Sequence, residues 1–443
     1  MRLLGALLLA GAALRFATLG EQSFWRDEAS TALALDGGLG HVLSSVRDLE
    51  GLPPGYFVLA WLWSKAFGLG EVGLRSLSAV IGVGTIGVAW ALGREWSARA
   101  GLLAAGLVAA SPFLVWYAQD ARPYALLVLL TATATLLLVR GRPLGWGLAA
   151  AAALLTHYFA VFLLVPQAAV LVRRHGRAAL PGLAPPVAAG LALLPLVAAQ
   201  ADNRVVWVSG TALTGRIADV AKHWTAGQLG TPVDAAGVLA LGLLAAGVLL
   251  GLGATRGRWL VATALAAMAL PVVLALAGSD YVLDRYLIAA LVPLLAVAAA
   301  GFASRPAAGV ALTLLFCAFT LDSAADDELH REDWRGVART LPAAAVVVAT
   351  ADADRPLRWY APGVRPVTTP VVTRDVVLLA SWRIGKPRPP TPPPPGGFVL
   401  AGRTDGPTTT VVRFRAPAPV PVEPGALAPL TLDSSEAPVL LQR

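Results

Sequence analysis

Charged side chains are scarce in this sequence. Only 14% of its 443 residues are Asp, Glu, Lys or Arg, whereas 56% are hydrophobic. A water-soluble domain of this length carries about a quarter charged residues. The deficit falls on the first three quarters of the chain, where apolar runs of about 17–25 residues alternate with short polar pieces. This pattern argues against a soluble protein and favours an integral membrane protein.

Cysteine is almost absent. The single residue, Cys317, lies in the last long apolar run. One cysteine excludes both a disulfide framework and a zinc site built on paired cysteines.

The hydropathy pattern predicts about eleven membrane spans, hence a mainly helical bundle. Two of them, at 144–155 and 158–172, are short and meet at His157. The first run has the small residues of a signal peptide, but ten further spans favour an uncleaved first helix. The predicted spans are 3–19, 72–92, 100–117, 124–139, 144–155, 158–172, 180–199, 235–253, 259–277, 285–301 and 307–321.

Arginines and acids alternate between the two sides of this predicted topology. Arginines concentrate in the cytoplasmic side of bacterial membrane proteins, which places the N-terminus in the cytoplasm and the C-terminal segment outside. The same bias accounts for much of the net charge of +8, so no nucleic-acid partner is expected. The inner side holds Arg2, Arg94, Arg99, Arg140, Arg142, Arg173, Arg174, Arg177, Arg256, Arg258 and Arg305, and the outer side holds Asp27, Glu28, Asp48, Glu50, Asp120, Asp202, Asp219, Asp280 and Asp284.

Two domains follow from this reading. Residues 1–321 form the membrane bundle, with a long first outer loop at 20–71. Residues 322–443 form a small extracytoplasmic domain, α/β or mostly β, because they alternate apolar stretches such as AAAVVVATADA, RDVVLLAS, GFVLAGR and TTTVVRFRA. The stretch 326–341 before them is expected to be helical, and AAAVVVATADA is expected to be a buried strand followed by a turn. The proline-rich piece 386–397 is expected to be a loop.

Charged and polar side chains gather at four points of the predicted outer face. Charges at a membrane boundary are costly, so their placement is informative. Facing loops of one bundle can converge on a single cavity, and carboxylates beside arginines there suit a lipid-borne phosphate. The groups are Arg26, Asp27 and Glu28; Asp120, Arg122 and Tyr124; His157 and Tyr158; and Asp284, Arg285 and Tyr286.

Each group also has a structural explanation. Asp27 and Glu28 fit a solvated loop end, and Asp120 fits a cap on the helix that Pro123 starts. His157 fits a polar turn residue, and Arg285 fits an interfacial anchor. Charge placement alone therefore supports a site for glycosyl transfer from a lipid phosphate only in outline. Such a reaction needs a carboxylate to take a proton from the acceptor and cations to stabilise the leaving phosphate.

Several segments, in order along the chain, resemble the C superfamily of membrane glycosyltransferases (GT-C). The resemblance is to the family 39-like branch of protein O-mannosyltransferases and aminoarabinose transferases. It covers about residues 20–340 and is densest in the first third. The segments are FWRDEASTALAL, GLPPGYFVLAWLWSKAFG, EVGLRSLSAVIGV, SPFLVWYAQDARPYAL, DRYLIAALVP and REDWRGVARTL.

The resemblance implies an inverting transferase that takes a sugar from a polyprenyl-phosphate donor on the outer face of a bacterial cell membrane. It implies a mannosyltransferase-like enzyme with a protein, glycan or lipid acceptor, working among membrane lipids. Its implied catalytic residues are Asp27 as base, Glu28 as its helper and Asp120 as a second acid. Asp27 and Asp120 are also candidate ligands of a divalent ion, magnesium or manganese.

The implied contacts to the donor come from the remaining polar residues of the four groups. Many relatives carry a basic residue or a histidine just before the Pro-Pro pair, and here that position is Leu52. This departure leaves the identity of the donor open. The candidates for binding the lipid phosphate or other parts of the substrate are Arg26, Arg122, Tyr124, His157, Arg285 and Tyr286.

Other membrane proteins remain alternatives. A flippase or a ligase of lipid-linked saccharides shares the substrate but not the acidic first loop. A secondary transporter is expected to show inverted halves and midplane charges, neither of which is visible in this sequence.

Overall fold

The computed structural model describes residues 2–201, 212–227, 234–384, 386–432 and 438–443. Asp202 lies outside the described residues. Backbone contacts divide the chain into two compact units. One, called here the bundle unit, is Met1–Leu19 with Gly37–Ser323, and the other, the sheet unit, is Gly20–Asp36 with Ala324–Arg443.

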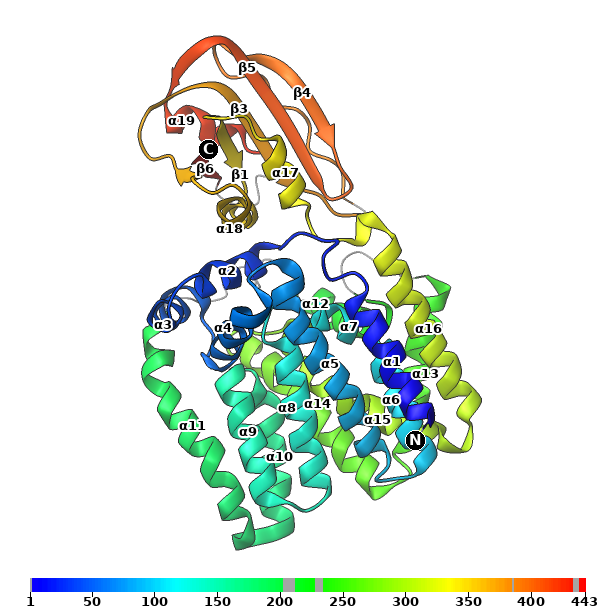
Figure 1. The fold of residues 1–443 in the computed structure, drawn as a ribbon. Helices are drawn as coiled ribbons and strands as arrows, with labels where there is room; N and C mark the ends of the chain where they lie inside the picture. Colours follow the sequence, from blue (N-terminus) through cyan, green and yellow to red (C-terminus); the bar gives the residue numbers. More distant parts are fainter. Residues whose placement is uncertain (1, 202–211, 228–233, 385, 433–437) are drawn as a thin grey trace. The chain divides into compact units, whose positions relative to one another are not determined.

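Every predicted span falls on a helix of the bundle unit (Figure 1). The mainly helical fold predicted from hydropathy is therefore confirmed. The helices are α1 (Arg2–Phe16), α5 (Glu71–Gly93), α6 (Ala98–Ala110) followed by α7 (Pro112–Ala118), α8 (Tyr124–Val139), α9 (Pro143–Thr156), α10 (Ala160–His175), α11 (Leu180–Ala199), α13 (Ala235–Gly251), α14 (Thr255–Leu276), α15 (Leu291–Gly301) and α16 (Pro306–Ala325).

Length and hydropathy together single out fewer spans. In the described part of the chain, four helical stretches pass as membrane spans: Glu71–Gly93, Ala160–Ala199, Thr255–Leu276 and Pro306–Ala325. The pair α6 and α7, bent by 60°, makes a fifth if it is one span. The shorter apolar helices include α8, α9 and α13. The number of eleven crossings therefore stays a prediction.

Shorter helices join these long ones. The first outer loop holds α3 (Leu39–Ser45), a π-helical turn (Val46–Glu50) and α4 (Gly55–Phe67). Helix α12 (Leu213–Ala226) precedes α13. The tenth predicted span starts later than expected, because two 3₁₀ turns, Asp284–Tyr286 and Ile288–Ala290, precede α15.

The break between α6 and α7 is stabilised by side chains from other helices. A helix end leaves its last carbonyl groups without partners in the helix, and buried carbonyls need replacements. The buried guanidinium of Arg15 donates to the carbonyls of Val108 and Ala109, both at 2.9 Å. The hydroxyl of Thr320 donates to the carbonyl of Ala110 at 2.8 Å. The sharp bend therefore leaves these three carbonyls bonded.

Glycines allow several helices to approach closely. A Cβ added to Gly147 of α9 would lie 2.1 Å from the carbonyl oxygen of Gly182 of α11. A Cβ on Gly301 of α15 would lie 2.1 Å from the carbonyl oxygen of Gly247 of α13. Small residues at such crossings let helix backbones pack tightly where no hydrophobic effect drives association.

The sheet unit contains a six-stranded mixed sheet in the order β2-β6-β1-β3-β5-β4. Strands β1 and β3 are parallel, and the other neighbouring pairs are antiparallel. The strands are β1 (Val346–Ala349), β2 (Arg365–Pro366), β3 (Val371–Ser381), β4 (Val399–Asp405), β5 (Thr409–Val422) and β6 (Val439–Gln442).

Both faces of this sheet are covered. One face packs Val347, Val377 and Leu441 against α17 (Trp334–Thr340) and α18 (Ala351–Tyr360). The other face packs Val348 and Phe414 against residues that include Leu427 of the short helix α19 (Pro424–Leu427), which a 3₁₀ turn (Ala428–Leu430) follows. The α/β character predicted for the tail is thus observed.

Two local expectations for the tail need correction. The stretch 326–341 is helical only at a 3₁₀ turn (Asp327–Leu329) and in α17, because Asp333 caps α17 by accepting a hydrogen bond from the amide of Gly336. The residues after β1, expected to turn, form the amphipathic helix α18, whose Ala353 and Leu357 face the sheet core.

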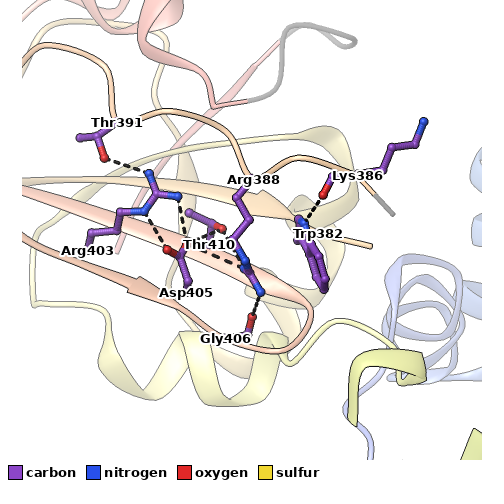
Figure 2. A network of polar contacts seen from close by, with 8 residues as sticks. All are labelled: Trp382, Lys386, Arg388, Thr391, Arg403, Asp405, Gly406 and Thr410. Atoms are coloured by element: carbon purple, nitrogen blue, oxygen red, sulfur yellow. Dashed lines mark hydrogen bonds and ion pairs between the residues drawn. The ribbon is translucent and has the colours of Figure 1, made fainter. Parts of the chain in front are cut away.

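The proline-rich segment is held to the β4–β5 hairpin by arginines (Figure 2). Arg403 bonds Asp405 through two nitrogens, at 2.9 and 3.1 Å, and donates to Thr391 at 3.0 Å. Arg388 donates to the carbonyl of Gly406 at 2.8 Å and stacks on Trp382. The Arg403 hydrogen bonds lower the pKa of Asp405, which therefore stays charged. Prolines lack the amide hydrogen needed for a strand, so these contacts fix the loop instead.

The glycine contact between α9 and α11 predicts a stability difference. Replacing Gly147→Ala forces a methyl group against a backbone carbonyl, so we expect a loss of about 1–3 kcal/mol. Gly190→Ala on α11 is the control, since no atom lies within 4 Å of its added Cβ. The unfolding temperature in detergent should fall for the first variant only. Equal temperatures for both would contradict the close packing.

Candidate functional site

The polar residues of the bundle unit that the sequence singled out converge in the structure. Asp120 and Arg122 lie in the turn after α7, and Tyr124 opens α8. His157 ends α9, and Arg285 and Tyr286 lie in the 3₁₀ turn before α15. The three segments meet through side chains: the rings of Tyr124 and Tyr286 lie 5.6 and 6.2 Å from the His157 ring, respectively.

Arg122 forms a buried ion pair with Glu50. The guanidinium Nη1 lies 2.5 Å from Oε2 of Glu50, and the two side chains are only 6% and 3% exposed. Arg122 also lies over the Phe57 ring, 5.8 Å from its centroid. A buried cation needs such a partner, because desolvation otherwise costs several kcal/mol. Glu50 therefore fixes the positive charge of Arg122 in the site.

His157 occupies the centre of this group and is 1% exposed. Its Nδ1 accepts a hydrogen bond from the amide of Phe159 at 3.2 Å. Burial and, to a smaller extent, the positive charges of Arg122 and Arg285 together lower the pKa of His157 to about 3. The imidazole is accordingly neutral at physiological pH.

Arg285 lies among aromatic rings. Its guanidinium carbon lies 5.6 Å from the centroid of the Tyr286 ring, which in turn packs 4.2 Å from the ring of Phe159. The site thus places two cations, two tyrosines and a neutral imidazole together, all of them buried except the half-buried Arg285. In such surroundings hydrogen bonds and charge interactions with an anion are strengthened.

Asp284 anchors this turn to α12. Its Oδ2 lies 2.6 Å from Nδ1 of His223, and its Oδ1 accepts the amide hydrogen of Arg285 at 2.7 Å. Burial opposes the charged form of Asp284, but the bond to His223 and the nearby Arg285 outweigh it and lower its pKa. A second contact in the same region pairs Arg216 with both oxygens of Asp280, at 2.8 and 2.5 Å.

Asp120 is fully buried in the turn between α7 and α8. It lies within electrostatic reach of Tyr117, as do Asp284, Arg285 and Tyr124. The carboxylate therefore belongs to the same group of residues. The N-cap residue of α8 is Pro123, which makes no side-chain cap, and capping by Asp120 stays a prediction.

The three remaining candidates, Arg26, Asp27 and Glu28, form the first turn of α2 (Arg26–Leu35) in the sheet unit. Acids in a first turn interact favourably with the helix dipole. Glu28 is completely buried and lies 3.5 Å from Arg331, whereas Arg26 forms an exposed pair with Asp352 at 3.4 Å. Asp27 is half-buried, and its carbonyl accepts the hydroxyl hydrogen of Thr31.

Further contacts hold the chain before α2 within the sheet unit. The amide of Phe24 donates to the Tyr360 hydroxyl at 2.6 Å, and Ser23 donates to the carbonyl of Glu332. The amide of Arg331 donates to the side chain of Gln22 at 3.0 Å. Asp27 and Glu28 are therefore presented on a helix whose start is fixed by α18 and by residues 331–332.

Comparisons with known proteins agree with this architecture. Residues 52–200, about a third of the chain, match the sequence model of the family described as dolichyl-phosphate-mannose-protein mannosyltransferase. A search of curated proteins finds no match. Among solved structures, ArnT from Cupriavidus metallidurans bound to undecaprenyl phosphate matches with a TM-score of 0.51 and 16% identity, over 80% of this chain and 84% of that chain.

The same ArnT in the apo state matches with a TM-score of 0.50 and 14% identity, over the same shares of the two chains. The chain therefore shares the fold of this ArnT. The GT-C-like helical fold expected from the motifs is thereby confirmed.

Several residues of the bundle unit escaped the motif-based selection. Glu50 was noted as an outer acid, but nothing in the sequence connected it to Arg122, which lies 72 positions later. His223 and Tyr117 also contribute. One signal in the sequence could have pointed to Glu50. It lies two residues before Leu52, the position at which the resembled family often carries a basic residue or a histidine.

No metal site is apparent among the residues that the structure describes. No group of three or more His, Cys, Asp and Glu side chains there is arranged to hold an ion. The proposed ligands Asp27 and Asp120 belong to different units. The divalent ion therefore stays a prediction.

The buried pair of Arg122 and Glu50 in the bundle unit predicts that two substitutions are non-additive. Arg122→Met leaves the Glu50 carboxylate buried without its cation and should cost about 3–5 kcal/mol. The double variant Arg122→Met/Glu50→Leu removes both charges and should recover most of that loss. Unfolding temperatures in detergent test this. A double variant as unstable as the single one would show that the pair is not the main contact of either side chain.

Proposed function

We propose that this protein is an inverting glycosyltransferase that moves a sugar from a polyprenyl-phosphate donor to an acceptor. The observation that carries the proposal is the meeting of the buried Arg122 and His157 with the half-buried Arg285 in one group. Two arginines and a neutral imidazole form a site suited to a phosphate.

The comparisons support this reading at the level of the fold. The matched ArnT structure holds undecaprenyl phosphate, a lipid phosphate, and the matched family is named for dolichyl-phosphate-mannose. The matched stretch includes the Asp120–Tyr124 turn and His157. We extend the lipid-phosphate chemistry to this chain on that basis.

The arginines serve the departing phosphate in this mechanism. As the bond between the anomeric carbon and the phosphate oxygen breaks, negative charge grows on the phosphate. Arg122 and Arg285 stabilise that charge, so the leaving group needs no proton. Tyr124 and Tyr286 border the same position with hydroxyl groups and aromatic faces, and Asp120 contributes a carboxylate to its surroundings.

Asp27 acts as the base in this proposal. The hydroxyl oxygen of the acceptor attacks the anomeric carbon from the face opposite the phosphate, and its proton passes to the Asp27 carboxylate. Glu28, paired with Arg331, keeps the first turn of α2 in place. Attack from the opposite face inverts the configuration of the sugar. Arg26 extends the polar surface beside the base.

The setting follows the predicted topology. The reaction occurs on the outer face of a bacterial cell membrane, with the first outer loop and the C-terminal domain outside. The donor sugar is a hexose such as mannose, and the acceptor is a protein, a glycan or a lipid. Among the alternatives, a flippase moves the donor without cleaving it, so product analysis separates the two functions.

Substitution of the base tests the mechanism. Asp27→Asn should lower transfer by at least about 100-fold, because the amide cannot accept the proton. Release of polyprenyl phosphate from hexose- or pentose-linked donors is followed by mass spectrometry in membranes containing the protein. Asp36→Asn, at the exposed end of the same helix, is the matched control and should retain activity.

The outcomes separate the competing functions. Equal turnover by the Asp27→Asn and wild-type proteins would refute Asp27 as the base. Movement of intact donor across the membrane, with no lipid phosphate released by the wild type, would favour a flippase.

Removal of divalent ions tests the proposed metal at Asp27 and Asp120. If magnesium or manganese helps to hold the donor phosphate, EDTA should abolish transfer and either ion should restore it. Undiminished turnover after chelation would show that the arginines balance the negative charge of the phosphate without a metal ion.

A further inference from the structure

His157 carries a buried ring nitrogen whose hydrogen-bonding capacity is unused within the described residues. Its Nε2 has no partner there, although the side chain is 1% exposed. Buried polar atoms in native proteins are nearly always bonded, so such an atom calls for an explanation. The surrounding rings of Tyr124, Phe159 and Tyr286 have centroids 5.2–6.2 Å from the imidazole.

The other ring nitrogen determines where the proton sits. Nδ1 accepts the amide hydrogen of Phe159, so it carries no proton of its own. A neutral imidazole has one N–H, which must then be on Nε2. The backbone on both sides is fixed as well, because the His157 amide donates to Ala153 and its carbonyl accepts from Ala160.

The neighbouring charges select the partner of this N–H. Arg122 and Arg285 both lie within electrostatic reach of the ring. Their positive potential disfavours protonation of the imidazole and the approach of a cation, and it favours an anion. Ligation of a metal ion through Nε2 would also move the proton to Nδ1, against the amide hydrogen of Phe159.

We propose that the Nε2–H of His157 is a neutral hydrogen-bond donor to a phosphate oxygen bound between Arg122 and Arg285. His157 is then neither an acid, nor a base, nor a metal ligand. This inference rests on the proposed function, since the phosphate is that of the lipid-linked donor or its product. It adds a hydrogen bond whose strength does not change with the ionisation of the histidine.

Two substitutions separate the two ring nitrogens. Asn at position 157 places its oxygen near the position of Nδ1, so it keeps the bond from Phe159 and loses the Nε2 donor. Gln places an amide N–H near the position of Nε2. We expect His157→Asn to weaken the binding of undecaprenyl phosphate roughly tenfold or more, and His157→Gln to stay within about threefold of the wild type.

Binding is measured on the full chain in lipid nanodiscs with undecaprenyl phosphate, from pH 6 to pH 8.5, with EDTA present. The affinity ratio of wild type to His157→Asn should be constant over this range. Inorganic phosphate should compete with the lipid less well in His157→Asn than in wild type. Equal affinities, equal competition in the two proteins or a ratio that changes with pH would each overturn the proposal. So would a loss that appears only with added magnesium.

The histidine ring itself provides a measurement that does not depend on a variant's folding. In protein labelled with ¹⁵N at its five histidines, the signal missing from His157→Asn identifies residue 157. Its shifts should report a bare Nδ1 and a protonated Nε2 throughout the pH range, and undecaprenyl phosphate should shift Nε2. The opposite tautomer would overturn the assignment. Failure of the wild type to bind the lipid would instead refute the proposed function on which it rests.

Discussion

The bend between α6 and α7 depends on hydrogen-bond donors that side chains of two other helices supply. Arg15 of α1 bonds two carbonyls at the end of α6, and Thr320 of α16 bonds a third. Without these donors the last carbonyls of α6 would be buried without hydrogen-bond partners, at a cost of about 1–3 kcal/mol each. Because α7 leads directly into the turn with Asp120 and Arg122, this stabilised bend also sets the position of the candidate site.

Reciprocal bonding extends the same constraint to α1. The side-chain amide of Gln119 donates to the carbonyls of Leu14 and Arg15 at 3.1 and 3.3 Å, and to the Thr18 hydroxyl. Gln119 therefore bonds carbonyls at the end of α1, and Arg15 of α1 bonds carbonyls at the end of α6. Polar side chains in this bundle satisfy helix ends as much as they form a binding site, and the two roles occur on neighbouring residues.

Two of the charged side chains of the site each have a nearby partner of opposite or complementary character. Arg122 has the carboxylate of Glu50, and Asp284 has His223, so each brings its charge into the bundle with a partner. His157 lies among these groups as an uncharged ring. A phosphate would therefore meet positive charge that is already oriented, and little reorganisation would accompany the development of charge on it.

The apolar runs of the sequence were sufficient to place the helices of the bundle, since a helix in a membrane needs little more than length and apolar side chains. The interval 180–199 was predicted without error, and 124–139 likewise. The motif YAQDARPYA likewise led to Asp120, Arg122 and Tyr124, because charges in such surroundings are unusual enough to be noticed. Periodicity was less informative in the tail, where α18 was taken for a turn.

The sequence by itself therefore determined the helical class, the helix positions and the polar residue types of the candidate site. Only the tertiary structure decided that Glu50 pairs with Arg122, that Asp284 is fixed by His223 and that Nδ1 of His157 is occupied by the amide of Phe159. Hydrophobic patterning reflects the environment of each helix face, and this information is contained within a single segment of the sequence. Ion pairs and tautomers depend on distances of about 3 Å between segments far apart in the chain, and those distances exist only after the helices have packed.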